Sequence, residues 1–137
     1  MNRRALILAL TLAACAAPPA EKERPAPTPL PLASTSWTLA GSGAEPGQEP
    51  TITFSAEGRA GGFTGCNQWF AQAETHDGGL AFRSVGMTRR ACGEPAATVE
   101  RGFGELLSNA RGGRIEGDTL IILGESNAEL GRLTRAR

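Results

Sequence analysis

Short segments that alternate apolar and polar residues, separated by glycine-rich turns, dominate the chain from residue 36 onward. The first two such segments are residues 37–39 and 51–54, and the sequence between them, GSGAEPGQEP, predicts a loop. Alternation with a period of two is typical of strands that bury one face. The pattern therefore restricts this part of the chain to a mainly antiparallel sheet.

Three more segments continue the sheet. A turn at residues 55–58 predicts a strand from Arg59 to about residue 64, and another strand starts near Asn67. Trp69 and Phe70 are adjacent on that strand, so at most one of them belongs fully to the core. The sequence HDGG at residues 76–79 favours a hairpin, because Asp-Gly readily adopts a type I′ turn. Beyond it, we expect Leu80, Phe82 and Ser84 on one face and Arg83 on the other.

The period changes after Cys92. Five apolar residues repeat at helical spacing and predict one helix from about Pro95 to Asn109; they are Val99, Phe103, Leu106, Leu107 and Ala110. Pro95 suits a first helical turn, and the glycines at residues 112 and 113 suit a helix exit. Because Gly102 and Gly104 each cost about 1 kcal/mol relative to alanine, this helix depends on packing against the sheet.

Two final strands are expected: residues 114–116 lead through a turn at 117–118 into residues 119–123, and a turn at 125–127 leads into residues 129–135. Residues 120–123 are apolar without a break, which indicates a strand covered on both faces. The fold class that follows is α+β: a small, curled, mainly antiparallel, half-barrel-like β-sheet with one packed α-helix.

The N-terminus has the pattern of a bacterial export signal. Arg3 and Arg4 precede a ten-residue stretch, apolar apart from Thr11, which is too short to span a bilayer as a helix. It ends in Leu-Ala-Ala-Cys, which resembles the lipobox of bacterial lipoproteins and implies cleavage before Cys15 and lipidation of that residue. An ordinary signal peptide is the alternative. Because Ala16 rather than Asp follows the cysteine, we expect anchoring in the outer membrane, with the domain facing the periplasm.

A proline-rich linker follows the lipidation site. Six of the nine prolines lie at residues 18, 19, 25, 27, 29 and 31, and this density favours extended polyproline II. The expected organisation is a signal peptide at 1–14, a lipidated cysteine and linker at 15–34, and a domain at 35–137. The chain after cleavage would carry 12 basic and 14 acidic residues, which argues against a nucleic-acid partner.

Cys66 and Cys92 form an even pair in a domain predicted to be exported. Oxidising compartments favour disulfides, and closing a loop of this length stabilises a fold by roughly 3 kcal/mol. Two free buried thiols and a metal site remain as alternatives. A metal site would need more ligands, and His76, the one histidine, lies in a predicted turn. Asn67 is expected to cap a turn or to adopt an unusual φ angle.

Taken in order, these motifs resemble the META domain (HslJ-like) family. The resemblance is carried by Trp-Thr-Leu at 37–39, Gly-Cys-Asn at 65–67, and Met-Thr-Arg-Arg-Ala-Cys at 87–92. It continues with Glu100 and Phe103 on the helix and Gly-Asp-Thr-Leu at 117–120. It implies a curled sheet with one helix and a protein of the cell envelope. Ala71, Ala73 and Arg90 depart from the residues usual in the family.

Neither the residues nor the resemblance points to a catalytic site or a cofactor, so we expect a non-enzymatic protein. Its expected role is to bind or support envelope components, with a connection to stress responses. The alternative is a lipid- or peptide-binding carrier that resembles secretion-pilot lipoproteins. Arg89 and Arg90, with Arg59 and Arg83 on neighbouring segments, form a possible anion or partner contact. A solvated face, with one arginine paired to Glu100, is the simpler interpretation.

Overall fold

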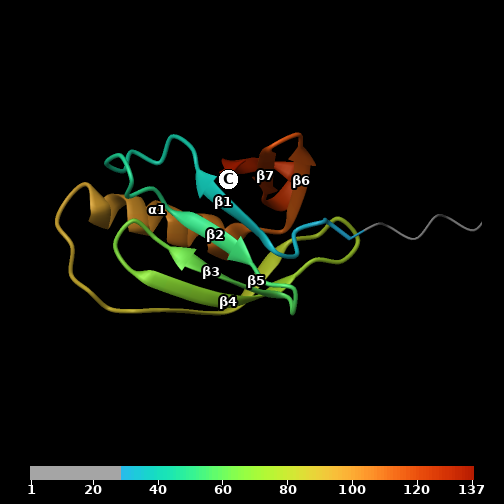
Figure 1. The fold of residues 1–137 in the computed structure, drawn as a ribbon, viewed down its shortest axis with the longest axis horizontal. Helices are drawn as coiled ribbons and strands as arrows, with labels where there is room; N and C mark the ends of the chain where they lie inside the picture. Colours follow the sequence, from blue (N-terminus) through green and yellow to red (C-terminus); the bar gives the residue numbers. More distant parts are fainter. Residues whose placement is uncertain (1–28) are drawn as a thin grey trace, which may run out of the picture.

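The computed structural model describes residues 29–137, so the predicted signal peptide and Cys15 lie outside the described residues. Figure 1 shows a sheet with one helix packed against it. The elements in chain order are β1 Thr35–Leu39, β2 Thr51–Phe54, β3 Arg59–Phe63, β4 Gln68–Glu74, β5 Ala81–Met87, α1 Ala96–Asn109, β6 Gly112–Glu116, β7 Thr119–Leu123, a 3₁₀ turn Glu125–Asn127 and β8 Glu129–Arg135. Within residues 29–137, no helix has the length and apolar content needed to cross a bilayer.

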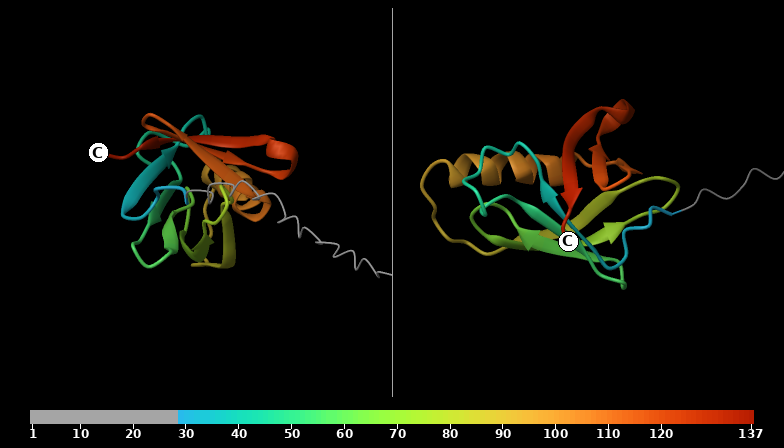
Figure 2. Two further views of the ribbon diagram at one scale, coloured as in Figure 1. Left: turned by 90° about the vertical axis from the view of Figure 1, so that its right-hand side faces the viewer. Right: turned by 45° about the horizontal axis from the view of Figure 1, so that its top comes forward.

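All eight strands belong to one antiparallel sheet. Their order is β5-β4-β3-β2-β1-β8-β7-β6, so the last strand of the chain returns to pair with the first. The sheet curls, as the end-on view in Figure 2 shows, and the two edges approach each other at a single bridge between Gly79 and Gly112. It remains open elsewhere. The predicted α+β class, with one curled antiparallel sheet and one helix, is confirmed.

Helix α1 packs its predicted apolar stripe into the curl. Val99, Phe103, Leu106 and Leu107 are buried, and Ala110 just beyond the helix is also buried. The Phe103 ring lies 5.6 Å from the ring of Trp69 on β4, in an edge-to-face arrangement. This packing supplies the stabilisation that a helix with two internal glycines lacks by itself.

The space inside the curl is filled by large side chains. Trp37, Trp69 and Phe103 are each no more than 2% exposed. Leu32, which precedes β1 and belongs to the proline-rich segment, is also buried in this core. In β7 the four residues 120–123 are all buried, which confirms a strand covered on both faces.

The β4–β5 hairpin shows one departure from the predicted pattern. Asp77 and Gly78 have φ angles of 57° and 73°, as its turn requires. Leu80 and Phe82 are buried as expected, but Ser84 is exposed. The prediction for Ser84 was wrong because a β-bulge, at which Ser84 adopts a φ of 53°, shifts the register between β4 and β5.

Trp69 and Phe70 lie on opposite faces of β4, as predicted. Trp69 is 2% exposed, whereas Phe70 is 62% exposed. The outer face of the sheet around Phe70 therefore presents a large apolar side chain to solvent.

Candidate functional site

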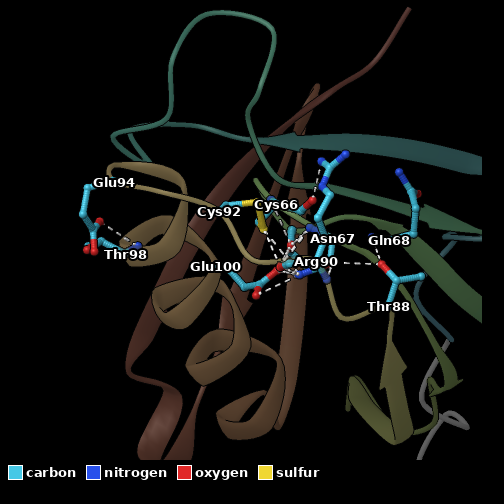
Figure 3. The surroundings of a disulfide bond; sticks show 10 residues. Cys66, Asn67, Gln68, Thr88, Arg90, Cys92, Glu94, Thr98 and Glu100 are labelled. Atoms are coloured by element: carbon cyan, nitrogen blue, oxygen red, sulfur yellow. Dashed lines mark hydrogen bonds between the residues drawn. A yellow bond between two sulfur atoms is a disulfide. The ribbon is translucent and has the colours of Figure 1, made fainter.

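A disulfide between Cys66 and Cys92 fixes the segment that connects β5 to α1. Cys66 lies in the loop between β3 and β4, and Cys92 lies near the middle of the connecting segment, residues 88–95. Their Cα atoms are 6.0 Å apart, within the usual range for a disulfide. The predicted pairing is confirmed, and it holds the long connection against the end of the sheet (Figure 3).

Asn67 reinforces the same connection through its side chain, which is buried in this region. Its amide nitrogen donates to the backbone oxygen of Arg90 at 3.1 Å and to the carboxylate of Glu100 at 3.0 Å. Its amide oxygen accepts from the backbone nitrogen of Arg90 at 2.6 Å and from the Thr88 hydroxyl at 3.0 Å. Asn67 has no positive φ angle, so of the two alternatives expected for this residue, a turn cap or an unusual φ angle, the second was wrong. Its role is to tie three segments together.

Glu100 completes this network from helix α1. Its carboxylate accepts hydrogen bonds from the Thr64 hydroxyl and, at 3.2 Å, from the backbone nitrogen of Asn67. The four arginines of the predicted contact are exposed, as the simpler interpretation of a solvated face expects, but no arginine of residues 29–137 lies within salt-bridge distance of Glu100, so the expected pairing with Glu100 was wrong. Sequence reasoning missed this network, although the signal for it was present in the Gly-Cys-Asn motif and Glu100.

The four arginines of the predicted contact do not form one cluster. Arg90 donates from its guanidinium to the backbone oxygen of Cys66 at 2.8 Å, and Arg89 beside it is exposed. Arg59 and Arg83 lie opposite Gln72 on either side of β4, and Arg83 is paired with Glu74 at 3.1 Å. The strand register thus divides the arginines into two pairs.

Phe70 lies between these two pairs. Gln68, Phe70 and Gln72 alternate along β4 and share its exposed face. A surface depression of about 310 Å³ on one side includes Phe63, Gln68 and Arg89, and one of about 460 Å³ on the other includes Arg59, Phe70 and Gln72. We call this surface, defined by Arg59, Phe63, Gln68, Phe70, Gln72 and Arg89, the Phe70 face.

The solved structures similar to this chain support the fold. An NMR structure of a protein from Burkholderia xenovorans is 25% identical, with a TM-score of 0.62 over 85% of this chain and 96% of that one. A crystal structure of a DUF4847 family protein from Bacteroides vulgatus is 14% identical, with a TM-score of 0.57 over 76% of this chain and 94% of that one. A second NMR structure is 16% identical, with a TM-score of 0.58 over 75% and 90% of the two chains.

The comparison with curated protein sequences found no match. Among protein families, the model of the META domain matches residues 30–137. That range includes every described strand, the helix, the disulfide and the Asn67 network. The chain therefore belongs to the META domain family.

Proposed function

We propose that this protein is a non-enzymatic lipoprotein of the cell envelope whose META domain binds another envelope component through the Phe70 face. The observation that carries the proposal is the 62% exposure of Phe70 on the outer face of β4, one strand in from the edge of the sheet. Phe63, which lies opposite Gln68 on β3, is partly exposed on the same face, whereas Met87 pairs with Trp69 and therefore faces the other side of the sheet. Exposed apolar groups gathered on one surface are typical of a binding site.

The filled core supports a protein that binds its partner on the surface rather than a carrier that holds a ligand inside. A carrier of lipid tails or peptides would need an apolar cavity inside the curl. That space is occupied by Trp37, Trp69 and Phe103, which are all buried. Among the described residues, every buried side-chain nitrogen or oxygen also has a hydrogen-bond partner. The partner would therefore meet the outside of the sheet.

The network of Asn67 and the disulfide gives this surface its shape. Both fix the backbone of the segment that carries Arg89 and so hold this exposed residue beside the end of the sheet. A surface that is ordered before binding loses less conformational entropy when its partner arrives.

Anchoring at the outer membrane, with the domain in the periplasm, is part of the proposal and rests on the lipobox resemblance at residues 12–15. Metabolic labelling with palmitate should mark the wild-type protein and not the Cys15→Ser variant. Membrane fractionation should place the labelled protein with the outer membrane. Absence of label in the wild type would overturn this part of the proposal.

Partner binding is tested by site-specific photo-crosslinking in intact cells. A photoreactive phenylalanine derivative replaces Phe70 in one strain and Ser108, which is exposed on helix α1, in the control strain. The proposal predicts discrete crosslinked products from position 70 that are missing from position 108. If position 70 gives no products, or if both positions give the same ones, the Phe70 face is not the binding site.

A further inference from the structure

We infer that the partner of the Phe70 face is a protein segment in extended conformation that places acidic side chains on both sides of an apolar one. This inference rests on the proposed binding function and specifies its partner. The apolar side chain packs on Phe70, and the carboxylates pair with Arg59 at one end and Arg89 at the other.

The charges on the Phe70 face support an acidic partner. Arg59 and Arg89 form no salt bridge within residues 29–137, whereas Arg83 is already paired with Glu74. Residues 1–28 hold four of the 14 basic residues and two of the 14 acidic ones. Residues 29–137 therefore carry 10 basic and 12 acidic residues, a net charge of −2. Two unpaired guanidinium groups on an otherwise acidic domain are complementary to carboxylates, which arginine can bind in bidentate fashion.

Phe70 is held as a fixed platform between these charges. Its cross-strand neighbours are Gly61 on β3 and Gly86 on β5. The ring lies so close to Gly86 that a Cβ atom there would be 2.5 Å from it. The glycine therefore lets the ring lie on the backbone of β5, and a ring held in this way offers contact area at little entropic cost.

The shape of the face favours an extended protein segment over a lipid surface. Depressions lie on both sides of Phe70 and are lined in part by the amides of Gln68 and Gln72, which can hydrogen-bond to a peptide. Residues two apart on β4 are separated by roughly 7 Å, which is also the spacing of alternate side chains in an extended peptide. A bilayer is instead entered by apolar groups that project beyond their surroundings.

The test is a selection of random 12-residue peptides, displayed on phage, against the purified full-length lipoprotein in detergent micelles. We expect recovered peptides to be enriched in Asp and Glu on both sides of an aromatic or aliphatic residue. A synthetic peptide of the recovered consensus should bind at least about tenfold more weakly to the Arg59→Glu/Arg89→Glu variant. The same library selected on that variant should yield peptides rich in Lys and Arg.

The control is the Arg101→Glu/Arg114→Glu variant, which makes the same charge change at two exposed arginines outside the Phe70 face, both of which are salt-bridged in the wild type. It should select the same acidic peptides as the wild type. Thermal unfolding of both variants verifies that they are folded.

Three results would overturn the inference: no recovered peptides, peptides without an acidic bias, or an unchanged selection after charge reversal at Arg59 and Arg89. Binding to phosphatidylglycerol vesicles that is lost in Phe70→Asp would assign the face to a lipid surface instead. If any of these results occurs while position 70 still crosslinks in cells, the inferred acidic partner segment is wrong, but the proposed binding function of the Phe70 face remains supported. Absence of crosslinks at position 70 counts against the binding function itself.

Discussion

Asn67 is the residue whose role the sequence indicated least well. Its place beside Cys66 marks it as part of a motif, yet its partners, Arg90 and Glu100, lie 23 and 33 residues away in the chain. Sequence patterns describe the periodicity of neighbours, and they contain no measure of which distant polar groups meet. The disulfide was easier to predict because an exported domain with two cysteines offers few alternatives.

Replacing Asn67 should be among the most damaging single changes to this domain. Asn67→Ala removes the hydrogen bonds of a buried amide to the backbone of Arg90 and to the carboxylate of Glu100, which costs about 2 to 3 kcal/mol of unfolding free energy. Urea denaturation measures the loss. Gln72→Ala, a truncation of an amide at an exposed position, should change stability by less than about 0.5 kcal/mol.

Asn67→Asp tests the same contact through its charge. The introduced carboxyl would face the carboxylate of Glu100, and the two like charges repel. Protonation of the introduced carboxyl relieves the repulsion, so the deficit relative to wild type should shrink as the pH falls from 7 to 5. A deficit that stays constant over this range would show that the two groups do not interact.

Glu94 gives the wild-type helix a pH-dependent contribution. A hydrogen bond with Thr98, with a further contribution from Arg101, lowers the pKa of Glu94 below its ordinary value of 4.5. A carboxyl whose pKa is lowered by folding stabilises the fold above its unfolded pKa, and this stabilisation is lost as the pH falls through the folded pKa. The Glu94→Gln variant should therefore melt slightly below wild type at pH 7, and the two melting temperatures should converge as the pH falls below the ordinary Glu pKa of 4.5. A constant gap across this range would contradict the assignment.

At the scale of elements, the sequence was informative wherever periodicity was regular. The helix and most of the strands follow from alternation, glycine turns and one apolar stripe. The bulge at Ser84 did not follow, because its sequence, Arg-Ser-Val-Gly, carries no residue that requires it. An extra residue in a strand is stabilised by packing across the sheet, which neighbouring residues alone do not reveal.

The two glycines inside α1 make a prediction about this element. An added Cβ at Gly102 or Gly104 would meet no atom within 4 Å outside the helix itself. Each change to alanine should therefore stabilise the domain by about 1 kcal/mol through helix propensity. Thermal unfolding followed by circular dichroism is the measurement.

Gly62→Ala is the contrasting control for these changes. Gly62 has a φ of 154°, and an added Cβ would lie 2.3 Å from the backbone oxygen of Thr51. This variant should lose stability. A loss in the Gly102 and Gly104 variants as well would mean that helix propensity does not determine the outcome in α1.

At the scale of the whole molecule, the pairing of the strands determined where the arginines of the candidate site lie. The sequence placed four arginines on neighbouring segments and suggested one cluster. The register of β3, β4 and β5 instead sets Arg59 and Arg83 on opposite sides of Gln72, and the β5–α1 connection carries Arg89 and Arg90 to the other end of Phe70. Pairing across a sheet depends on all strands together, so this arrangement was beyond the reach of local patterns.

The disulfide acts on the whole chain, because it joins residues 26 positions apart and encloses β4 and β5. In the chain-entropy model, closing such a loop restricts the unfolded state and stabilises the fold by about 3 kcal/mol. The Cys66→Ser/Cys92→Ser variant should therefore unfold at lower urea concentration than wild type, by that free energy. Reductant should destabilise the wild type to a similar extent and leave the double variant unchanged. If reductant destabilises the double variant equally, the effect comes from a source other than this bond, and the disulfide does not support the fold in the way its position implies.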